Sequence, residues 1–197
     1  MSLSPLLKQH PIDLLLEWIA QARSAGARRP KAMALATATL NGLPSVRMVI
    51  ARQVDHDGIT FYTDARSAKG RDLAANPRAA TTFYWPELSR SVRVSGRVET
   101  LPHTQTEAFF AGYAPAIQRA MRVSTQSAPL ADRTALERAI AADAVAYPDV
   151  GPIAPGFVGY RLVPAEMEFW AEADDVLHDR VLFTLQGEDW RVGALQP

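Results

Sequence analysis

The strands that decide the fold lie in residues 79–99, which read AATTFYWPELSRSVRVSGRVE. In the second half of this stretch, Val92, Val94 and Val98 alternate with polar side chains. Such alternation of apolar and polar residues is typical of an antiparallel sheet with one buried and one wetter face. We therefore predict two strands here, Ala79–Trp85 and Ser91–Glu99.

Turn signals before this stretch predict further strands. Asn41-Gly42 joins a strand at Ala32–Thr39 to one at Ser45–Gln53, and Asp57-Gly58 leads from there into Ile59–Thr63. These dipeptides accept the positive φ that a tight hairpin needs. The first five strands are expected to form a meander. After residue 155, strands are expected at 156–164, 166–170, 177–185 and 190–195.

Helical patterns precede and interrupt the strands. We expect helices at Ile12–Ala25, Ser67–Ala75, Thr104–Tyr113 and Pro129–Ala146, with 114–128 unassigned and 147–155 a loop. The predicted fold is mainly β, an antiparallel barrel with helices packed on it. We expect one domain over 1–197, made of an N-terminal helix region (1–30), barrel strands (31–100), helices (101–150) and C-terminal strands (151–197).

Composition limits the function classes. The chain has 197 residues with 21 basic and 21 acidic side chains, so nucleic-acid and anionic-membrane partners are disfavoured. It has no cysteine, which excludes disulfides, thiolate nucleophiles and Cys-type zinc sites. We find no signal peptide and no apolar stretch of about 20 residues, so we expect a cytoplasmic protein. The histidines His10, His56, His103 and His178 lack metal-ligand spacing, so no metal site is expected.

Two local features indicate an anion site. Residues 62–71, YTDARSAKGR, place a hydroxyl residue at an expected helix start among several cations. The N–H groups there would suit a phosphate with Lys69 neutralising its charge, although a capped surface helix explains the same residues. Arg47 lies inside a strand. It needs an anionic partner if it points inward, and it is equally compatible with a solvated arginine on the wet face.

Several segments recur in the same order in one known family. They are Arg47 with the apolar residues after it, Phe61–Thr63, Ser67–Gly70, Asn76–Ala80, Phe83–Leu88, Val92–Glu99, Ser124–Ser127, Glu168–Trp170 and Leu177–Arg180. With these residues the chain resembles the pyridoxamine 5′-phosphate oxidase family over about residues 11 to 197. The resemblance implies an FMN-binding split β-barrel, a homodimer with FMN at the subunit interface, and an FMN-dependent oxidoreductase.

The resemblance also implies which residues contact the cofactor. It assigns the FMN phosphate to Arg47 and Lys69. It assigns other FMN contacts to Met48, Val49, Ile50, Tyr62, Thr63, Ser67, Gln126, Ser127, Trp170 and Arg180. Two positions depart from the family, because an expected arginine beside Lys69 is Ala68 and an expected glutamine is Ser91.

The implied substrate site departs further. The family binds a substrate phosphate with a lysine, a tyrosine, an arginine and a serine, and here these positions are Arg52, Phe109, Tyr113 and Ile117. An arginine that flanks the substrate ring is Val176, whereas His178 is retained. The family's N-terminal segment over the substrate is also expected to lack a counterpart. These replacements suit a larger or less charged aromatic substrate better than a phosphate dianion.

The sequence therefore predicts an FMN-dependent oxidase, similar to the phenazine-biosynthesis branch of the family. It would transfer a hydride equivalent from a reduced tricyclic precursor to the flavin, with molecular oxygen as acceptor. Arg52 and His178 are expected to orient the substrate, and His178 is the residue we would test for proton transfer. A pyridoxamine or pyridoxine 5′-phosphate oxidase of vitamin B6 metabolism and a weakly catalytic flavin-binding protein are the alternatives.

Overall fold

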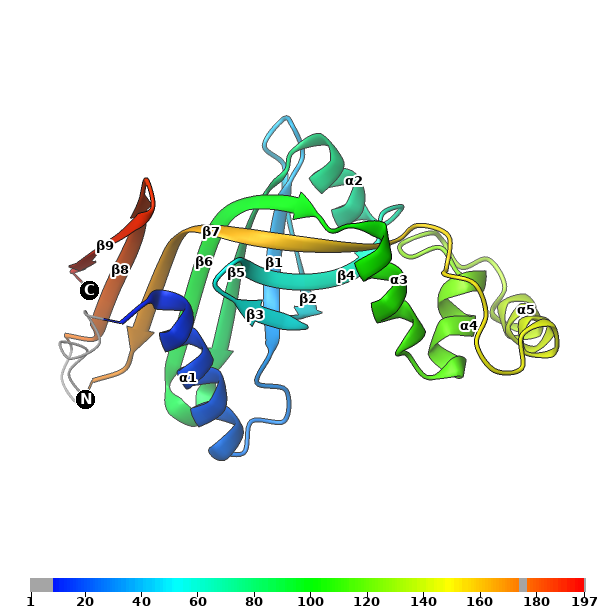
Figure 1. Cartoon of the computed structure of the whole chain (residues 1–197), viewed down its shortest axis with the longest axis horizontal. Coiled ribbons are helices and arrows are strands. Elements are labelled where there is room, and N and C mark those ends of the chain that lie inside the picture. The colour runs from blue at the N-terminus through cyan, green and yellow to red at the C-terminus, as the bar shows by residue number, and fades with distance from the viewer. Residues whose placement is uncertain (1–8, 174–176, 197) are drawn as a thin grey trace.

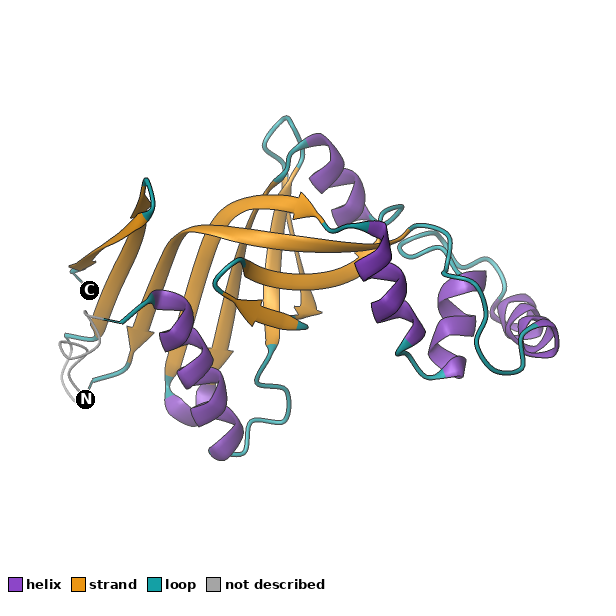
Figure 2. Cartoon of the chain, in the orientation of Figure 1, coloured by secondary structure: helices purple, strands orange, loops and turns teal. Residues whose placement is uncertain are grey.

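An antiparallel sheet forms the framework of the computed structural model, which describes residues 9–173 and 177–196 (Figure 1). Its strands are β1 (Ala32–Ala38), β2 (Pro44–Ile50), β3 (Gln53–Asp55), β4 (Gly58–Asp64), β5 (Arg78–Trp85), β6 (Arg90–Thr100), β7 (Phe157–Ala171), β8 (Asp179–Gln186) and β9 (Asp189–Ala194). The helices are α1 (Pro11–Ser24), α2 (Ala68–Ala75), α3 (His103–Ala111), α4 (Pro115–Val123) and α5 (Arg133–Ala146), with a 3-10 turn at Pro86–Leu88. The predicted antiparallel split barrel with packed helices is confirmed (Figure 2).

The order of the strands differs from the predicted meander. Along the sheet the order is β2-β1-β5-β6-β7-β4-β3, and β8 pairs with β7 and β9. The hairpins β1–β2 and β3–β4 form as expected. However, β4 pairs with β7, and β5 pairs with β1 and β6, because α2 carries the chain across the sheet between β4 and β5.

The predicted strand at 45–53 is interrupted. It ends as β2 at Ile50 and resumes as β3 at Gln53. At the break, the Ala51 N–H donates to the Lys31 carbonyl and the Arg52 N–H donates to the Thr60 carbonyl. The chain thus changes its pairing partner from the β1 side to β4, and this change directs Arg52 toward the region described below.

Two predicted strands, 156–164 and 166–170, are a single strand, β7. Pro164 lacks an N–H group and would ordinarily end such a strand. The register between β6 and β7 shifts between Ser95 and Gly96, so that Gly96 lies opposite Pro164 and Ser95 opposite Glu166. The bulge leaves Ala165 without a β6 partner and lets the strand continue past the proline.

Gly96 is the residue that makes this bulge possible. A Cβ atom at position 96 would lie 1.9 Å from the Val163 carbonyl oxygen. We expect Gly96→Ala to lower the free energy of unfolding by about 1–3 kcal/mol, measured by urea titration. Gly193→Ala is the matched control because a Cβ there meets no atom within 4 Å, and it should change stability by less than about 0.5 kcal/mol. Equal stability of Gly96→Ala and wild type would contradict this prediction.

The helical assignments are partly corrected. The unassigned stretch 114–128 contains α4, and α5 begins at Arg133 rather than at residue 129 because Asp132 caps its N-terminus. Gln118 of α4 is fully buried and donates to the carbonyls of Phe110, Ala111 and Tyr113. α4 is therefore held by contacts that its own sequence pattern does not reveal.

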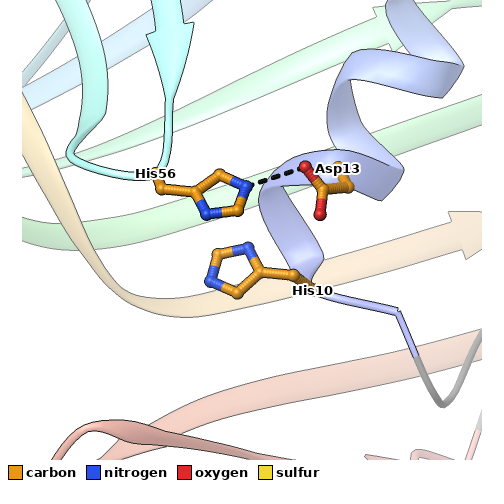
Figure 3. Close-up of side chains that lie close together, drawn as sticks. All are labelled: His10, Asp13 and His56. Carbon is orange, nitrogen blue, oxygen red and sulfur yellow. Dashed lines mark hydrogen bonds and ion pairs between the residues drawn. The ribbon is translucent and has the colours of Figure 1, made fainter.

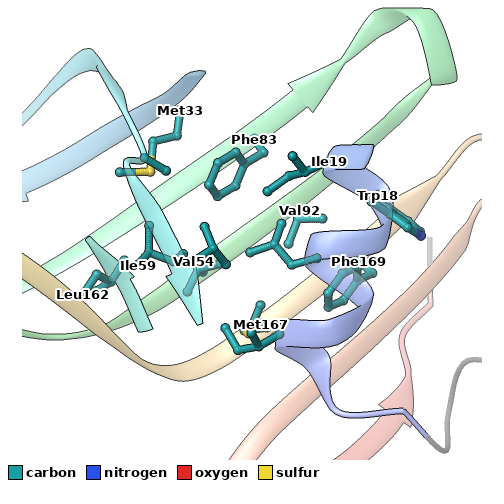
Figure 4. Close-up of a cluster of buried hydrophobic side chains, with 14 of the residues drawn as sticks. Trp18, Ile19, Met33, Val54, Ile59, Phe83, Val92, Leu162, Met167 and Phe169 are labelled. Carbon is teal, nitrogen blue, oxygen red and sulfur yellow. The ribbon is translucent and has the colours of Figure 1, made fainter. Parts of the chain in front are cut away.

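The hydrophobic core lies between α1 and the inner face of the curled sheet (Figure 4). Trp18 of α1 meets the ring of Phe169 edge-on, with centroids 5.2 Å apart, and is 2% exposed. Phe83 and Val92, from the stretch that predicted the fold, are fully buried beside it. In the part of the chain that the structure describes, no helix is long and apolar enough to cross a membrane.

Candidate functional site

A cavity of about 500 Å³ opens between β2, β4 and the start of α2. We call it the Lys69 cavity. It is lined by Ser45–Ile50, Arg52, Tyr62, Thr63, Ala68, Lys69, Gln126 and Ser127. With the exception of Ser67, the cofactor positions predicted in the first 130 residues of the chain lie around this one space. Ser67 lies just behind it as the N-cap of α2 and accepts from the Gly70 N–H.

Lys69 is a buried cation without an anionic hydrogen-bond partner among the described residues. It is 6% exposed, and its Nζ donates to Thr63 Oγ1 at 3.0 Å, to Gln126 Oε1 at 2.8 Å and to Ser67 Oγ at 3.3 Å. Burial lowers the pKa of Lys69, and the charge of Arg47 lowers it further. An anion in the cavity would relieve both effects.

Arg47 brings a second positive charge to the same cavity. Its Nη1 donates to Thr37 Oγ1 at 2.7 Å and to the Leu35 carbonyl, and its Nη2 lies 3.9 Å from Asp72 Oδ2. Its side chain is 19% exposed, which favours the inward orientation over the solvated one. Burial lowers the pKa of Arg47, although Asp72 opposes this effect. Arg47 and Lys69 carry two positive charges against the one negative charge of Asp72, and this excess of positive charge suits a phosphate.

Arg52 and Tyr62 of the Lys69 cavity also belong to an aromatic cluster with Phe109 and Tyr113, which do not line the cavity. Tyr62 stacks on Phe109 of α3 with centroids 3.8 Å apart. Arg52 lies over the rings of Phe109 and Tyr113, with its Cζ 5.7 and 5.6 Å from their centroids, and Nη2 donates to Tyr113 Oη at 3.2 Å. The structure thus brings together three of the residues predicted for the substrate.

A separate cavity of about 410 Å³ contains the C-terminal part of the predicted site. It is lined by Ser91, Arg93, Glu168, Trp170, His178 and Arg180, and it shares no lining residue with the Lys69 cavity. The rings of Trp170 and His178 are 5.2 Å apart, and His178 Nδ1 accepts from the Ala173 N–H at 3.4 Å. Val176, which was predicted for the substrate site, lies outside the described residues.

Glu168 is a site residue that the sequence reasoning missed. It is 6% exposed, accepts from Arg180 Nε and Nη2 at 2.9 and 2.8 Å, and forms an ion pair with Arg93. Arg180, predicted to contact the cofactor, is therefore held by a carboxylate of its own chain. Arg93 and Glu168 lie opposite each other on β6 and β7, and this pairing becomes visible only when the register is known.

Two of the four histidines, which lack metal-ligand spacing in the sequence, are neighbours in the structure (Figure 3). His10 and His56 stack with centroids 4.3 Å apart and planes 11° apart, and His56 Nε2 is 2.8 Å from Asp13 Oδ1. Lone pairs in two nearly parallel ring planes do not converge on one metal ion. The His10 nitrogens also face N–H donors, from Ile12 and Trp190. The cluster joins α1, the β3–β4 turn and β9, and its geometry does not favour a metal centre.

Comparisons with known proteins identify the relatives of this chain. Residues 19–147 match the family model described as pyridoxamine 5′-phosphate oxidase, and residues 157–197 match the pyridoxine 5′-phosphate oxidase C-terminal dimerisation region. A pyridoxine/pyridoxamine 5′-phosphate oxidase from Anaeromyxobacter dehalogenans is 41% identical over 100% of both chains. Another, from Gluconobacter oxydans, is 40% identical over 97% of this chain and 96% of the relative.

Two solved structures share the fold. PhzG from Burkholderia lata 383, solved in complex with tetrahydrophenazine-1-carboxylic acid, has a TM-score of 0.91 and 40% identity, and the match covers 95% of this chain and 93% of PhzG. A pyridoxamine 5′-phosphate oxidase-related, FMN-binding protein from Nostoc punctiforme has a TM-score of 0.76 at 19% identity, with 96% and 100% coverage. The second of these supports the fold alone.

Proposed function

The chain belongs to the pyridoxamine 5′-phosphate oxidase family of FMN-dependent oxidoreductases, and from this premise we propose that it oxidises a reduced aromatic ring substrate that carries a carboxylate. Electrons would pass from this substrate through FMN to molecular oxygen. The proposed cofactor site is the Lys69 cavity, and the proposed substrate site is the neighbouring aromatic cluster of Tyr62, Phe109 and Tyr113 with Arg52.

The residues of the Lys69 cavity fit FMN. Lys69 and Arg47 supply two positive charges for the phosphate, and Thr63 and Gln126 supply polar groups beside them. When bound, FMN would supply the redox chemistry, a hydride acceptor that can pass electrons on to oxygen. The chain's own residues bind the phosphate, orient the reacting rings and exclude water.

A second subunit would complete the proposed site. Residues 157–197 match a dimerisation region, and the remaining predicted cofactor contacts, Trp170 and Arg180, line a separate cavity of the same chain. We propose that the cavity around Trp170, His178 and Arg180 of one subunit closes over the Lys69 cavity of the other. His178, with Nδ1 accepting from the backbone, would present Nε2–H toward the substrate and orient it by donating a hydrogen bond.

The observation that carries the substrate proposal is the contact of Arg52 with Phe109 and Tyr113. In this contact a single guanidinium lies over two aromatic rings. The family's phosphate site, in contrast, has further polar groups. A guanidinium pairs well with a planar carboxylate, and the rings suit a flat polycyclic partner. The PhzG structure, at 40% identity, holds a tricyclic carboxylate of this kind, which supports the proposal.

A pyridoxamine 5′-phosphate oxidase is the second candidate. The curated relatives cited above have this name, and the Arg52 guanidinium with the Tyr113 hydroxyl could also bind a phosphate. A flavin-binding protein with little catalytic activity is the third, because Ala68 and Ser91 replace expected FMN contacts.

An anaerobic flavin titration separates these candidates. The FMN-loaded protein is mixed with tetrahydrophenazine-1-carboxylic acid or with pyridoxamine 5′-phosphate, and the visible flavin absorbance is followed before and after air is admitted. Bleaching by the tricyclic acid with recovery in air is the result expected here. Bleaching by the phosphorylated vitamer alone would favour the second candidate. No bleaching by either compound would favour the third candidate. Protein that does not bind FMN would overturn all three.

The affinity for FMN should fall as the pH is raised into the alkaline range. Protonated Lys69 neutralises the phosphate, and its lowered pKa means that it loses this proton below the ordinary lysine value of 10.5. Below the lowered pKa the affinity stays level. Above it, binding must also take up a proton, so the affinity falls by up to about tenfold per pH unit. Titrations by flavin fluorescence from about pH 7 upward measure this slope. An identical slope in Lys69→Met would contradict the assignment to Lys69.

A further inference from the structure

Residues 124–127 form an arm outside any helix or strand that brings Gln126 and Ser127 to the Lys69 cavity. Ser127 has a φ of 69°, a left-handed conformation that residues other than glycine rarely adopt. Because the arm has no regular structure, contacts with the rest of the chain must fix its position.

Two such contacts come from the end of β4 and the turn after it. The Gln126 N–H donates to Asp64 Oδ2 at 3.3 Å, and Arg66 Nη2 donates to the Ser124 carbonyl at 3.2 Å. Asp64 and Arg66 are not among the described residues that line the Lys69 cavity. They hold the backbone of the arm, whereas Thr63 and Lys69 contact the Gln126 side chain inside the cavity.

Asp64 and Arg66 are themselves rigidly paired. Asp64 Oδ1 accepts from the Arg66 N–H at 2.8 Å and from Nε at 2.9 Å, and Arg66 Nη2 lies 2.7 Å from Oδ2. Burial raises the pKa of Asp64, but the hydrogen bonds from Arg66 outweigh this effect and keep the pKa below its ordinary value. A two-pronged arginine–carboxylate contact of this kind fixes both side chains in one geometry.

The loop before β7 closes around the pair. Gly156 has a φ of +80°, and a Cβ there would lie 2.6 Å from Asp64 Oδ1 and 2.8 Å from Arg66 Nε. The Ala65 N–H donates to the Gly156 carbonyl at 2.7 Å. The pair therefore sits between the arm and this loop, in a space that the absence of a side chain at position 156 leaves for it.

We propose that Asp64 and Arg66 are positioning residues of the cofactor site. Their ion pair holds the 124–127 arm in place, so that Gln126 and Ser127 already occupy their binding positions before FMN enters. The inference rests on the proposed binding of FMN in the Lys69 cavity. Without the pair, the arm must become ordered as the cofactor binds, and this ordering weakens the affinity.

Hydrogen exchange and FMN titration of full-length variants test the proposal together. In Arg66→Ala apoprotein, the amides of residues 124–127 should exchange faster than in wild type, and the dissociation constant for FMN should rise by about five- to twentyfold. Asp64→Asn should act in the same direction, and Arg66→Lys should recover part of the affinity because it restores the charge. Arg133→Ala, which removes an exposed ion pair with Glu137 on α5, is the matched control and should leave both quantities unchanged.

The outcomes are distinguishable. Faster exchange with weaker FMN binding supports the proposal. Unchanged exchange in Arg66→Ala overturns it, and so does faster exchange with an unchanged dissociation constant, while the proposed FMN site itself survives in both cases. If wild-type protein binds no FMN, the proposed function fails first and this inference fails with it.

Discussion

Lys69→Met is expected to raise the dissociation constant for FMN by about 10- to 150-fold. Methionine keeps most of the length of the side chain but removes the charge, and a hydrogen bond to a charged group contributes about 1.5–3 kcal/mol. Arg47 remains in the variant, so binding should weaken rather than disappear. Quenching of flavin fluorescence on titration into apoprotein measures the change.

Arg71→Met is the control for this experiment. Arg71 lies on the same helix and carries the same charge, but it is exposed and donates to the Arg66 carbonyl outside the cavity. Its loss should change the dissociation constant by less than about threefold, as expected for a solvent-screened charge. The thermal stability of Lys69→Met apoprotein should be equal to or above that of wild type, because a buried charge has been removed. Wild-type affinity in Lys69→Met would show that the phosphate binds elsewhere.

Local signals predicted most of the elements. The alternation in 91–99, the turns Asn41-Gly42 and Asp57-Gly58, and the capped helix after Ser67 all depend on neighbouring residues, and each corresponds to an element of the structure. What could not be predicted depends on distant partners. β7 continues through Pro164 because of a bulge on β6, and α4 is held by buried Gln118.

The same distinction between local signals and distant partners applies to the candidate site. The cluster around Lys69 was detectable because a strand end, a helix cap and several cations follow one another in the sequence. The remaining cofactor positions came from the resemblance, and their roles stay predictions. The pairing of Arg93 with Glu168 can be predicted only when the register of β6 and β7 is known. The role of the Asp64–Arg66 pair becomes visible only when the folded position of the 124–127 arm is known. An acidic residue two positions before an arginine at a strand end was the available signal for the latter pair.

Arg52→Met is expected to lower kcat/KM for tetrahydrophenazine-1-carboxylic acid by about 10- to 100-fold, mainly through KM. The reason is that the variant loses the guanidinium proposed to pair with the carboxylate while Phe109 and Tyr113 keep their rings. Steady-state oxygen consumption measures both constants. The dissociation constant for FMN should stay within about threefold of wild type, since the phosphate cations Arg47 and Lys69 are untouched.

Two further variants make this test specific for the charge at position 52. Tyr113→Phe removes the hydroxyl that accepts from Arg52 but keeps the ring, and we expect less than about a fivefold loss because the guanidinium remains. Arg52→Lys keeps the charge without the planar fork, and its kcat/KM should fall between those of wild type and Arg52→Met.

A neutral analogue of the substrate, without its carboxylate, should be oxidised equally by wild type and Arg52→Met. If Arg52→Met instead lowers kcat/KM equally for the neutral and the carboxylated substrate, Arg52 shapes the cavity and does not bind the carboxylate. The choice of substrate would then rest on the aromatic rings of Tyr62, Phe109 and Tyr113.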